Sequence, residues 1–534
     1  MKNSVTYNHC ILIFFFLTLQ ACGGAGNYNN GQGSQNNQGS NFDSTVEYVW
    51  REGTYPASFL LEGFCETPRS GNSYIDVQGS SYLEKMWLRS WSNETYLWYD
   101  EIIDTDPGIF SVTDYFDLLI TNELTDSGAA KDNFHFYVDT ETWNASFESG
   151  ESSGYGARFS INNNTNPRTV IVVYSDPDTP ATSADVNMQR GTRILSIDGI
   201  DINTNENSEL AILNAGLSPA SIGETHTMTI QNLDDEQPRE ITITSATVIS
   251  SPVQHVTTLN TESGNVGYML FNSHISTAEE GLVNAINTLA DSNITDLVLD
   301  LRYNGGGALA IASQLAYMIT GPIATSNKVF ERTSFNDKHL TINPVTGEAL
   351  TPTPFYDQTL GFSLSTGQSL PYLDLPRVFI LSTGDTCSAS ESIINGLQGI
   401  GVEVIQIGDT TCGKPYGFYA TDNCSNTYFT VQFQGVNHVG FGDYSDGFTP
   451  ENSDDIYATP VPGCTVIDDL DHGFGDPDEA LLSAALQYRN TGTCPEFEIA
   501  ETDTISVNQQ KTTAPRPGLN SIAEPIWTKV RVLK

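Results

Sequence analysis

Positively charged side chains are scarce in this sequence. Lys and Arg together number 23 among 534 residues, against 65 Asp and Glu, so the formal net charge at pH 7 is −42. A surface of this sign repels the phosphate backbone of nucleic acids, which excludes a nucleic-acid-binding protein. We interpret the acidity as a feature that keeps the protein soluble.

Histidine and cysteine are also few, with eight of each. No histidine lies at ligand spacing beside the cysteines, so we expect no metal site and no cofactor. Beyond Cys10 and Cys22, an even set of six cysteines is left, namely Cys65, Cys387, Cys412, Cys424, Cys464 and Cys494. In an exported protein this set predicts up to three disulfides, with 15 possible pairings open.

The apolar stretch at 11–19 is too short to cross a bilayer, but it suits the core of a signal peptide. It ends in LQAC, with Ala21 directly before Cys22, which resembles a bacterial lipobox. The resemblance implies a signal peptide at 1–21 and a lipid on Cys22. Because Gly23 follows, it also implies transport to the outer membrane of the cell envelope. Ordinary secretion with cleavage elsewhere is the alternative.

Composition divides the rest of the chain into five segments. Residues 22–45 are rich in Gly, Asn and Gln and predict a flexible linker. Aromatic and aliphatic residues at three-to-four spacing predict a small helical domain at 46–150. Short alternating strands predict a β domain at 151–250, and alternating strands and helices predict a mixed α/β core at 251–494. The tail, 495–534, shows little periodicity.

The β segment resembles a PDZ domain. Its strands, one helix and the glycine-flanked stretch RGTRILSIDGIDI carry the resemblance. The glycine-bearing loop would consist of Gly154, Tyr155, Gly156 and Ala157. The resemblance implies that N–H groups of this loop bind the C-terminal carboxylate of a peptide, while the adjacent strand edge pairs with it. A plain β-turn is the alternative.

Two strand-to-helix turns in the core have residue types that suit nucleophilic catalysis. In DLRYNGGGALA, the glycines at 305–307 let the backbone approach a substrate closely. In DTCSASESIIN, Ser388 precedes a helix whose first N–H groups are free to stabilise an oxyanion. Taken alone, Ser388 and Glu391 also fit a helix-capping box.

Lys414, in the downstream stretch GDTTCGKPYGF, favours the catalytic interpretation. A serine hydroxyl needs a base to attack an amide, and a lysine can serve if burial lowers its pKa. His438 is the alternative base.

Jointly, DLRYNGGGAL, CSASES and TTCGKPYG resemble peptidase family S41, the C-terminal processing proteases, over about 150–490. The resemblance implies a mixed α/β core of strand–strand–helix units, like the crotonase/ClpP-type superhelix, with a PDZ-like β domain before it. It implies that Ser388 is the nucleophile and that Lys414 is the general base. It also implies that the N–H groups of Gly306 and Ala389 form the oxyanion hole.

The sequence departs from the family beside the lysine. Many members have a glutamine four residues after it, where this chain has Phe418. Gln432 is a candidate substitute for orienting Lys414, and Ser390 is the next candidate nucleophile. Unlike typical members, the chain also has a cysteine beside each catalytic turn, Cys387 and Cys412.

Together these features predict a membrane-tethered serine endopeptidase that cleaves exported or envelope polypeptides near their C-termini, with the PDZ-like unit selecting or gating substrates. Its partners would be polypeptides and, through the lipid, a membrane; no oligomeric state is predicted. The alternative is a catalytically silent, PDZ-containing peptide-binding lipoprotein. A third hypothesis, a carrier of hydrophobic ligands, has no supporting feature. The presence of both Ser388 and Lys414 favours the enzyme, because a binding protein has no need of that pair.

Overall fold

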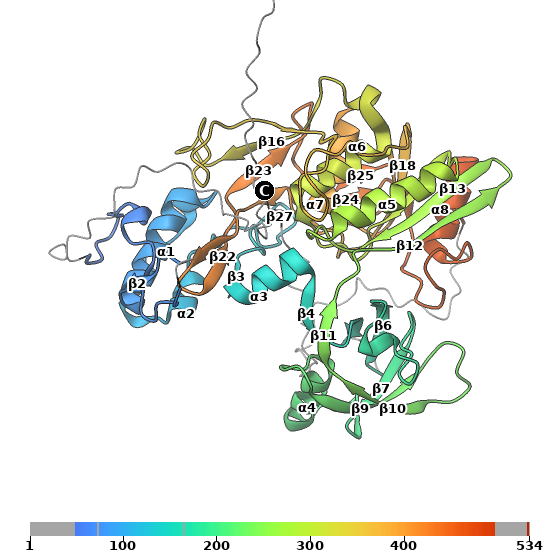
Figure 1. Ribbon diagram of the computed structural model, residues 1–534, viewed down its shortest axis with the longest axis horizontal. Coiled ribbons are helices and arrows are strands. Elements are labelled where there is room, and N and C mark those ends of the chain that lie inside the picture. Colours follow the sequence, from blue (N-terminus) through green and yellow to red (C-terminus); the bar gives the residue numbers. More distant parts are fainter. Residues whose placement is uncertain (1–47, 72–73, 164, 166, 497–530, 533–534) are drawn as a thin grey trace, which may run out of the picture.

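The computed structural model describes residues 48–71, 74–163, 165, 167–496 and 531–532 (Figure 1). The expected signal peptide (1–21), the lipidation site Cys22 and the linker (22–45) lie outside the described residues, as does most of the tail (495–534). The six cysteines within the described part all form disulfides, which are Cys65–Cys424, Cys387–Cys412 and Cys464–Cys494.

A six-stranded sheet forms the centre of the core. Its strands, in spatial order, are β12 (Val253–Thr261), β13 (Gly264–Phe271), β14 (Asp296–Asp300), β18 (Arg377–Ser382), β19 (Glu403–Gly408) and β26 (Gly463–Thr465). β12 is antiparallel to β13, and the other pairings are parallel. All five residues of β14 are buried, as expected for a continuous apolar strand in a parallel sheet.

Helices cover both faces of this sheet (Figure 1). They are α5 (Ala278–Asp291), α6 (Leu309–Thr325), α7 (Ala389–Gly399) and α8 (Ala480–Thr491). On β14, Leu297 and Leu299 pack with α5, α6 and α7, whereas Val298 packs with α8. The alternation of side chains along the strand therefore explains the three layers of the mixed α/β core.

The two candidate catalytic turns follow neighbouring strands. β14 and β18 are parallel, with Asp300 opposite Leu381. Because parallel strands end at the same edge of a sheet, the chain leaves both strands side by side. The glycines at 305–307 follow β14, and Ser388 follows β18.

The PDZ-like unit contains a second six-stranded sheet. Its strands are β5 (Ala157–Asn162), β6 (Thr169–Ser175), β7 (Arg193–Ile197), β8 (Ile200–Asp201), β9 (Thr225–Gln231) and β10 (Arg239–Thr244). The spatial order is β10-β9-β7-β6-β5, with β8 beside β7, so β5 is an edge strand. Helix α4 (Asn207–Leu217) packs on the same apolar core. A ribbon of β4 (Glu151–Gly154) and β11 (Ala246–Ile249) leads to the main core (Figure 1).

The N-terminal region combines helices with three short strands. Its elements are β1 (Phe64–Cys65), β2 (Val77–Gln78), α1 (Ser81–Thr95), α2 (Val112–Phe116), β3 (Phe136–Asp139) and α3 (Thr140–Asn144). β3 pairs with β22 (Asn426–Phe429) of the core. The ring of Phe136 stacks on Phe429 with centroids 4.4 Å apart. The region is joined to the core by this strand pairing, with Phe136 and Val138 half-buried against it.

Shorter strands complete the core. One sheet has the order β17 (Thr353–Pro354), β16 (Val329–Phe335), β23 (Phe433–Val436) and β20 (Tyr416–Gly417). The others are β15 (Gly307–Ala308), β21 (Thr421–Asn423), β24 (Phe448–Pro450), β25 (Thr459–Val461) and β27 (Arg531–Val532). The single-turn helices are η1 (Ser58–Leu60), η2 (Tyr99–Glu101), η3 (Pro107–Ile109), η4 (Ala145–Ser149) and η5 (Pro180–Thr182).

Candidate active site

Ser388 is the N-cap residue of α7, in the turn after β18. Its φ of 63° lies in the left-handed region, which residues other than glycine rarely adopt. Its side chain is fully buried, and Oγ has no hydrogen-bond partner among the described residues. Backbone strain and an unpaired buried hydroxyl both cost stability, so they indicate a position held for chemistry.

The carboxylate of Glu391 joins the Ser388 turn to the Lys414 turn. One oxygen accepts the N–H groups of Ser388 and Lys414, each at 2.8 Å. The other accepts the N–H of Gly413 at 2.8 Å and the hydroxyl of Thr411 at 2.6 Å. Burial raises the pKa of the Glu391 carboxyl, and these hydrogen bonds oppose that shift. The sequence predicted only the bond to Ser388, as part of a helix cap.

Lys414 is fully buried and lies between two aromatic rings. Its Nζ is 4.5 Å from the ring centroid of Phe134 and 4.2 Å from that of Phe418. These are cation–π distances. Phe418, at the position of the family's glutamine, therefore contacts the lysine through its ring face, and Phe134 is supplied by the N-terminal region.

The disulfide Cys387–Cys412 is a second link between the two turns. Cys387 directly precedes Ser388, and Cys412 lies two residues before Lys414. Within the described residues, Cys387, Glu391 and Cys412 are the one set close enough to share a metal ion. Because cysteine binds a metal as a free thiolate, the disulfide does not fit that role.

Gly306 was predicted to donate its N–H to the oxyanion. In this arrangement the N–H donates to Asn304 Oδ1 at 3.0 Å instead. The Asn304 carbonyl oxygen accepts the Cys387 N–H at 3.0 Å. Asn304 thus fixes the shape of the glycine turn and binds it to the Ser388 turn, and sequence reasoning missed it.

His274 supports the glycine turn from the end of β13. Its Nδ1 faces two acceptors, Asn304 Oδ1 at 3.0 Å and the Gly306 carbonyl at 3.2 Å, so the neutral ring carries its hydrogen on Nδ1. Its own N–H also donates to the Gly306 carbonyl at 2.9 Å. Burial lowers the pKa of His274 to about 4, so the ring is uncharged at neutral pH.

The other predicted residues of this turn lie in the first turn of α7. Ala389 is buried and directly follows Ser388, where helix N–H groups lack intrahelical acceptors. The hydroxyl of Ser390 donates to the Asn304 carbonyl at 3.0 Å. Ser390 therefore makes a structural contact, and its hydroxyl is engaged away from a substrate.

Gln432 and His438, the two alternatives raised by the sequence, have hydrogen-bond partners of their own. Gln432 Oε1 accepts the Tyr419 N–H at 2.8 Å, and its amide donates to Thr95. The ring of His438 accepts the Val329 N–H at 3.3 Å. The preceding residue of His438, Asn437, packs on Gly399 at the C-terminal end of α7, whereas Ser388 is at its N-terminal end.

The central part of the chain has recognisable relatives. Residues 265–431 match the model of peptidase family S41. The recognition of this family from the three motifs is confirmed.

Two curated relatives are both named "Carboxyl-terminal-processing protease". The one from Picosynechococcus sp. is 26% identical over 267 residues, and the one from Synechocystis sp. is 25% identical over 268 residues. Each match covers 50% of this chain, and 55% and 53% of the relatives, respectively. The chain thus spans about half the length of the curated relatives it matches.

A crystal structure of a protein assigned to the S41 proteases, from Bacteroides fragilis, has a TM-score of 0.57 to this chain. The two are 22% identical, and the match covers 80% of this chain and 100% of that one. The predicted fold class, a mixed α/β S41 core with a PDZ-like β domain, is confirmed.

A cavity of about 230 Å³ opens beside the Lys414 turn of the S41 core. Its wall includes Phe134, which also contacts Lys414, and Gly413, which directly precedes it. Asp446 and Asp455 line the same space. The cavity therefore lies next to Lys414 and has acidic groups on its wall.

Arg158, on edge strand β5, connects the PDZ-like unit to both candidate catalytic turns of the core. Its guanidinium donates to the Tyr303 carbonyl at 2.9 Å and to the Asp385 carboxylate at 2.9 Å. Tyr303 directly precedes Asn304, and Asp385 lies three residues before Ser388. Arg158 thus contacts both turns from the PDZ-like unit.

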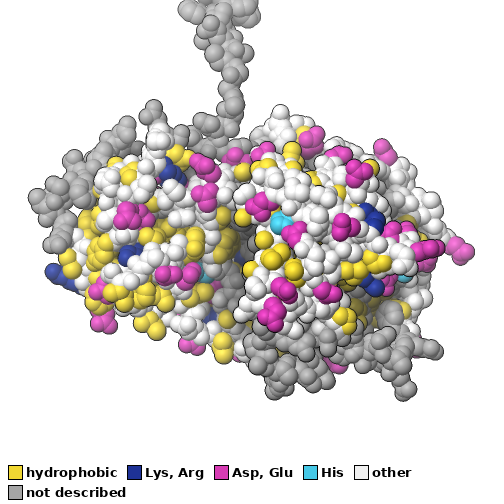
Figure 2. All heavy atoms as spheres, turned by 90° about the horizontal axis from the view of Figure 1, so that it is seen from below, with side chains coloured by type: hydrophobic (Ala, Val, Ile, Leu, Met, Phe, Trp, Pro, Cys, Tyr) yellow, Lys and Arg dark blue, Asp and Glu magenta, His cyan; other side chains and the backbone are white. Residues whose placement is uncertain are grey.

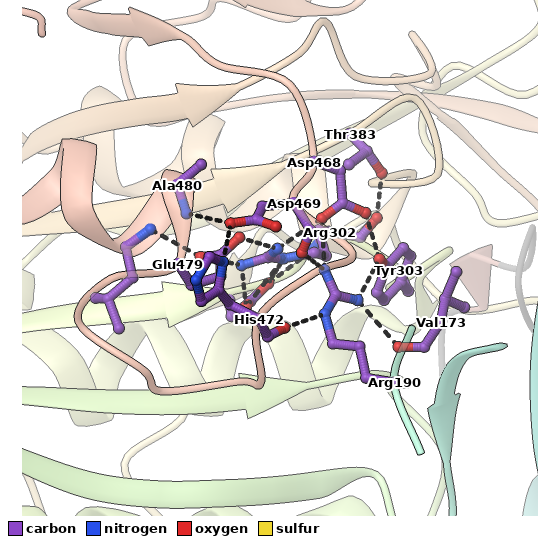
Figure 3. Close-up of polar contacts among 12 residues, drawn as sticks. Val173, Arg190, Arg302, Tyr303, Thr383, Asp468, Asp469, His472, Glu479 and Ala480 are labelled. Atoms are coloured by element: carbon purple, nitrogen blue, oxygen red, sulfur yellow. Dashed lines mark hydrogen bonds and ion pairs between the residues drawn. The ribbon is translucent and has the colours of Figure 1, made fainter. Parts of the chain in front are cut away.

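A second connection lies at Arg190 (Figure 3). Its guanidinium donates to Tyr303 Oη at 2.7 Å, to Asp468 at 2.6 Å and to the Val173 carbonyl at 3.0 Å. Arg302, fully buried at the end of β14, binds the same Asp468 at 2.7 Å. Although burial acts to raise it, the two arginines hold the pKa of Asp468 below its usual value. The carboxylate therefore stays charged and joins the two units.

The predicted peptide-binding loop leads directly into β5. The Tyr155 carbonyl accepts the Ala181 N–H, and the Gly156 carbonyl accepts the Asp176 N–H. Gly156 has a φ of 79°, and a Cβ there would lie 2.4 Å from the Thr179 side chain, so only glycine fits. Its neighbours Gly154 and Ala157 end β4 and begin β5.

Proposed function

We propose that this protein is a serine peptidase of the C-terminal processing type, with Ser388 as nucleophile and Lys414 as general base. The observation that carries the proposal is the buried Glu391 carboxylate, which binds the N–H groups of both residues. Two turns separated by 26 residues in sequence are thereby fixed to one group.

The proposed reaction begins when the neutral Lys414 amine accepts the proton of Ser388 Oγ. The oxygen attacks the substrate carbonyl, and the Ala389 N–H stabilises the oxyanion. Gly306 joins as second donor once its N–H leaves Asn304. The ammonium then protonates the departing amine, which leaves an acyl-enzyme. Water, deprotonated by the same lysine, hydrolyses the ester and restores Ser388.

The PDZ-like unit supplies substrate choice in this proposal. A peptide adds to edge strand β5 and places its carboxylate at the loop Gly154–Ala157. Arg158 and Arg190 then communicate its presence to the S41 core, because both contact Tyr303.

The proposed location is the outer membrane of a bacterial envelope, where lipid on Cys22 tethers the protein. Of the helices in the described part of the chain, none is both long and apolar enough to cross a bilayer. Acidic side chains are spread over the face shown in Figure 2, with few Lys or Arg among them. This charge agrees with polypeptide rather than nucleic-acid partners.

Hydrolysis of short peptides by the purified chain tests the proposal. Ser388→Ala should abolish it, and Ser483→Ala, the same change at an exposed position of α8, should not. Retained hydrolysis in Ser388→Ala would reject the nucleophile. Peptide binding without hydrolysis by the unaltered chain would instead favour the catalytically silent binding protein.

A further inference from the structure

A strand from the end of the chain lies in the candidate active site. β27 pairs in parallel with β15, with Arg531 opposite Gly307 and Val532 opposite Ala308. Gly307 is the residue after Gly306, the predicted oxyanion donor. β27 also lies next to β20, which begins two residues after Lys414. The strand thus runs between the glycine turn and the base turn.

Main-chain pairing of this kind is how extended peptides bind exposed strand edges. A substrate of a peptidase is also an extended main chain, so β27 occupies a position in which a substrate strand could pair with β15. Ser388 and Lys414 are both 0% exposed in this arrangement. A substrate therefore has no access to them until the site opens.

The segment that carries β27 is basic, whereas its neighbour β20 lies among acidic groups. The stretch IWTKVRVLK, residues 526–534, has three basic residues and no acidic one, in a chain with a net charge of −42. Its β-branched residues also favour an extended strand. The neighbouring β20 lies in a negative environment: along with burial, the carboxylates of Asp443, Asp132 and Asp446 raise the pKa of Tyr416 to about 12.

We propose that the segment carrying β27 is a ligand of the chain's own peptide-binding site and competes there with substrates. The inference rests on the proposed peptidase site and adds to it a built-in occupant. The occupant is held by strand pairing with Gly307 and Ala308, and its sequence has the opposite sign of charge to the chain as a whole. A substrate must displace it before reaching Ser388.

A chain that ends at Val530 tests the competition. A tethered competitor acts at a high effective concentration, so its removal should lower the KM for a short peptide about ten-fold, with kcat unchanged. The double variant R531P/V532P should act in the same way, because proline removes the N–H groups that pairing needs. R531A/V532A keeps these N–H groups and is the control. Its KM should stay closer to that of the full chain. Equal KM values for the full and shortened chains would overturn the proposal.

A binding measurement separates this proposal from the proposed catalysis. In the Ser388→Ala background, a fluorescent IWTKVRVLK peptide should bind the shortened chain at least about ten-fold more tightly than the full chain. A peptide with proline at the two pairing positions should bind neither. If the full and shortened chains that retain Ser388 both fail to hydrolyse peptides, but this difference in binding is found, the proposed occupant is supported and the proposed peptidase activity is rejected. Equal binding of IWTKVRVLK to both chains, or to neither, would refute the occupant.

Discussion

The guanidinium of Arg158 lies 2.9 Å from the carbonyl oxygen of Tyr303, so a side chain of the PDZ-like unit bonds the backbone directly before the glycine turn. The same guanidinium reaches Asp385 on the Ser388 turn. One residue of the PDZ-like unit thus contacts both parts of the candidate active site.

Arg158→Ala should therefore lower kcat on short peptides. A hydrogen bond from a charged group contributes about 1.5–3 kcal/mol, which predicts a loss of about ten-fold or more. Arg158→Lys should recover part of it. Arg193→Ala, in the same unit but with an exposed side chain, is the control. An Arg158→Ala enzyme with wild-type kcat would show that the contact has no role in catalysis.

Lys414→Met should lower kcat by about 10²–10⁴-fold, the usual contribution of a general base, while keeping the apolar contacts of the stem. Lys414→Arg should be equally poor, because a guanidinium stays charged. Lys328→Met, at a lysine that bonds the Ile400 carbonyl at the other end of α7, should leave peptide hydrolysis intact. An active Lys414→Met enzyme together with an inactive His438→Ala enzyme would reverse the assignment.

Acid should destabilise the protein through His274. Its pKa is about 4 when folded and about 6.5 when exposed, so the unfolded chain binds more protons between these values. The free energy of unfolding therefore rises with pH across this window, by at most about 3 kcal/mol from this group, and the gain is lost again on acidification.

Unfolding of His274→Gln by urea, measured from pH 4 to 7, should show a flatter pH dependence than the unaltered chain. His339→Gln makes the same change beside the Glu94 carbonyl and serves as the comparison. An unchanged slope in His274→Gln would mean that other groups cause the acid sensitivity.

The disulfide beside the catalytic turns should matter for activity as well as stability. Cys387–Cys412 and Cys464–Cys494 have similar sequence separations, 25 and 30 residues. Loss of either should lower the free energy of unfolding by about 3 kcal/mol. C387S/C412S should also lower kcat, because of the three disulfides in the described part of the chain this one joins the Ser388 turn to the Lys414 turn. An equal effect of C464S/C494S on kcat would assign the loss to general destabilisation.

Cys22→Ser should release the protein from membranes or block its maturation, because lipidation needs the thiol. Cell fractionation and the mass of the mature chain measure both effects. Cys10→Ser, within the segment expected to be removed, is the matched control. If Cys22→Ser sediments with membranes and is processed as usual, the lipoprotein prediction is wrong.

The sequence predicted the core best where local pattern and burial agree. The predicted alternation of strands and helices is found there: β14 is fully buried, and α5 buries the apolar residues of one face. The sequence also predicted that both candidate turns lie between a strand and a helix, whereas the adjacency of the two strands appears only in the structure.

Local sequence patterns did not predict the contacts between distant segments. Phe134 lies against Lys414 from 280 residues away, and nothing in its local sequence indicates a contact with a lysine. The spacing of Ser388 and Glu391 in the sequence predicts the hydrogen bond between them. The hydrogen bonds of Glu391 to Gly413 and Lys414 form only when the fold brings the two turns together. The partner of β3 likewise lies almost 300 residues further along the chain.

The disulfide Cys65–Cys424 has a consequence for the order of folding. Its cysteines are 359 residues apart, and the PDZ-like unit and Ser388 lie between them. Since the chain is synthesised from its N-terminus, Cys65 cannot form this disulfide until most of the core, including Cys424, has been made. The covalent ring therefore closes late, and a single cut anywhere inside it leaves two fragments that separate only after reduction.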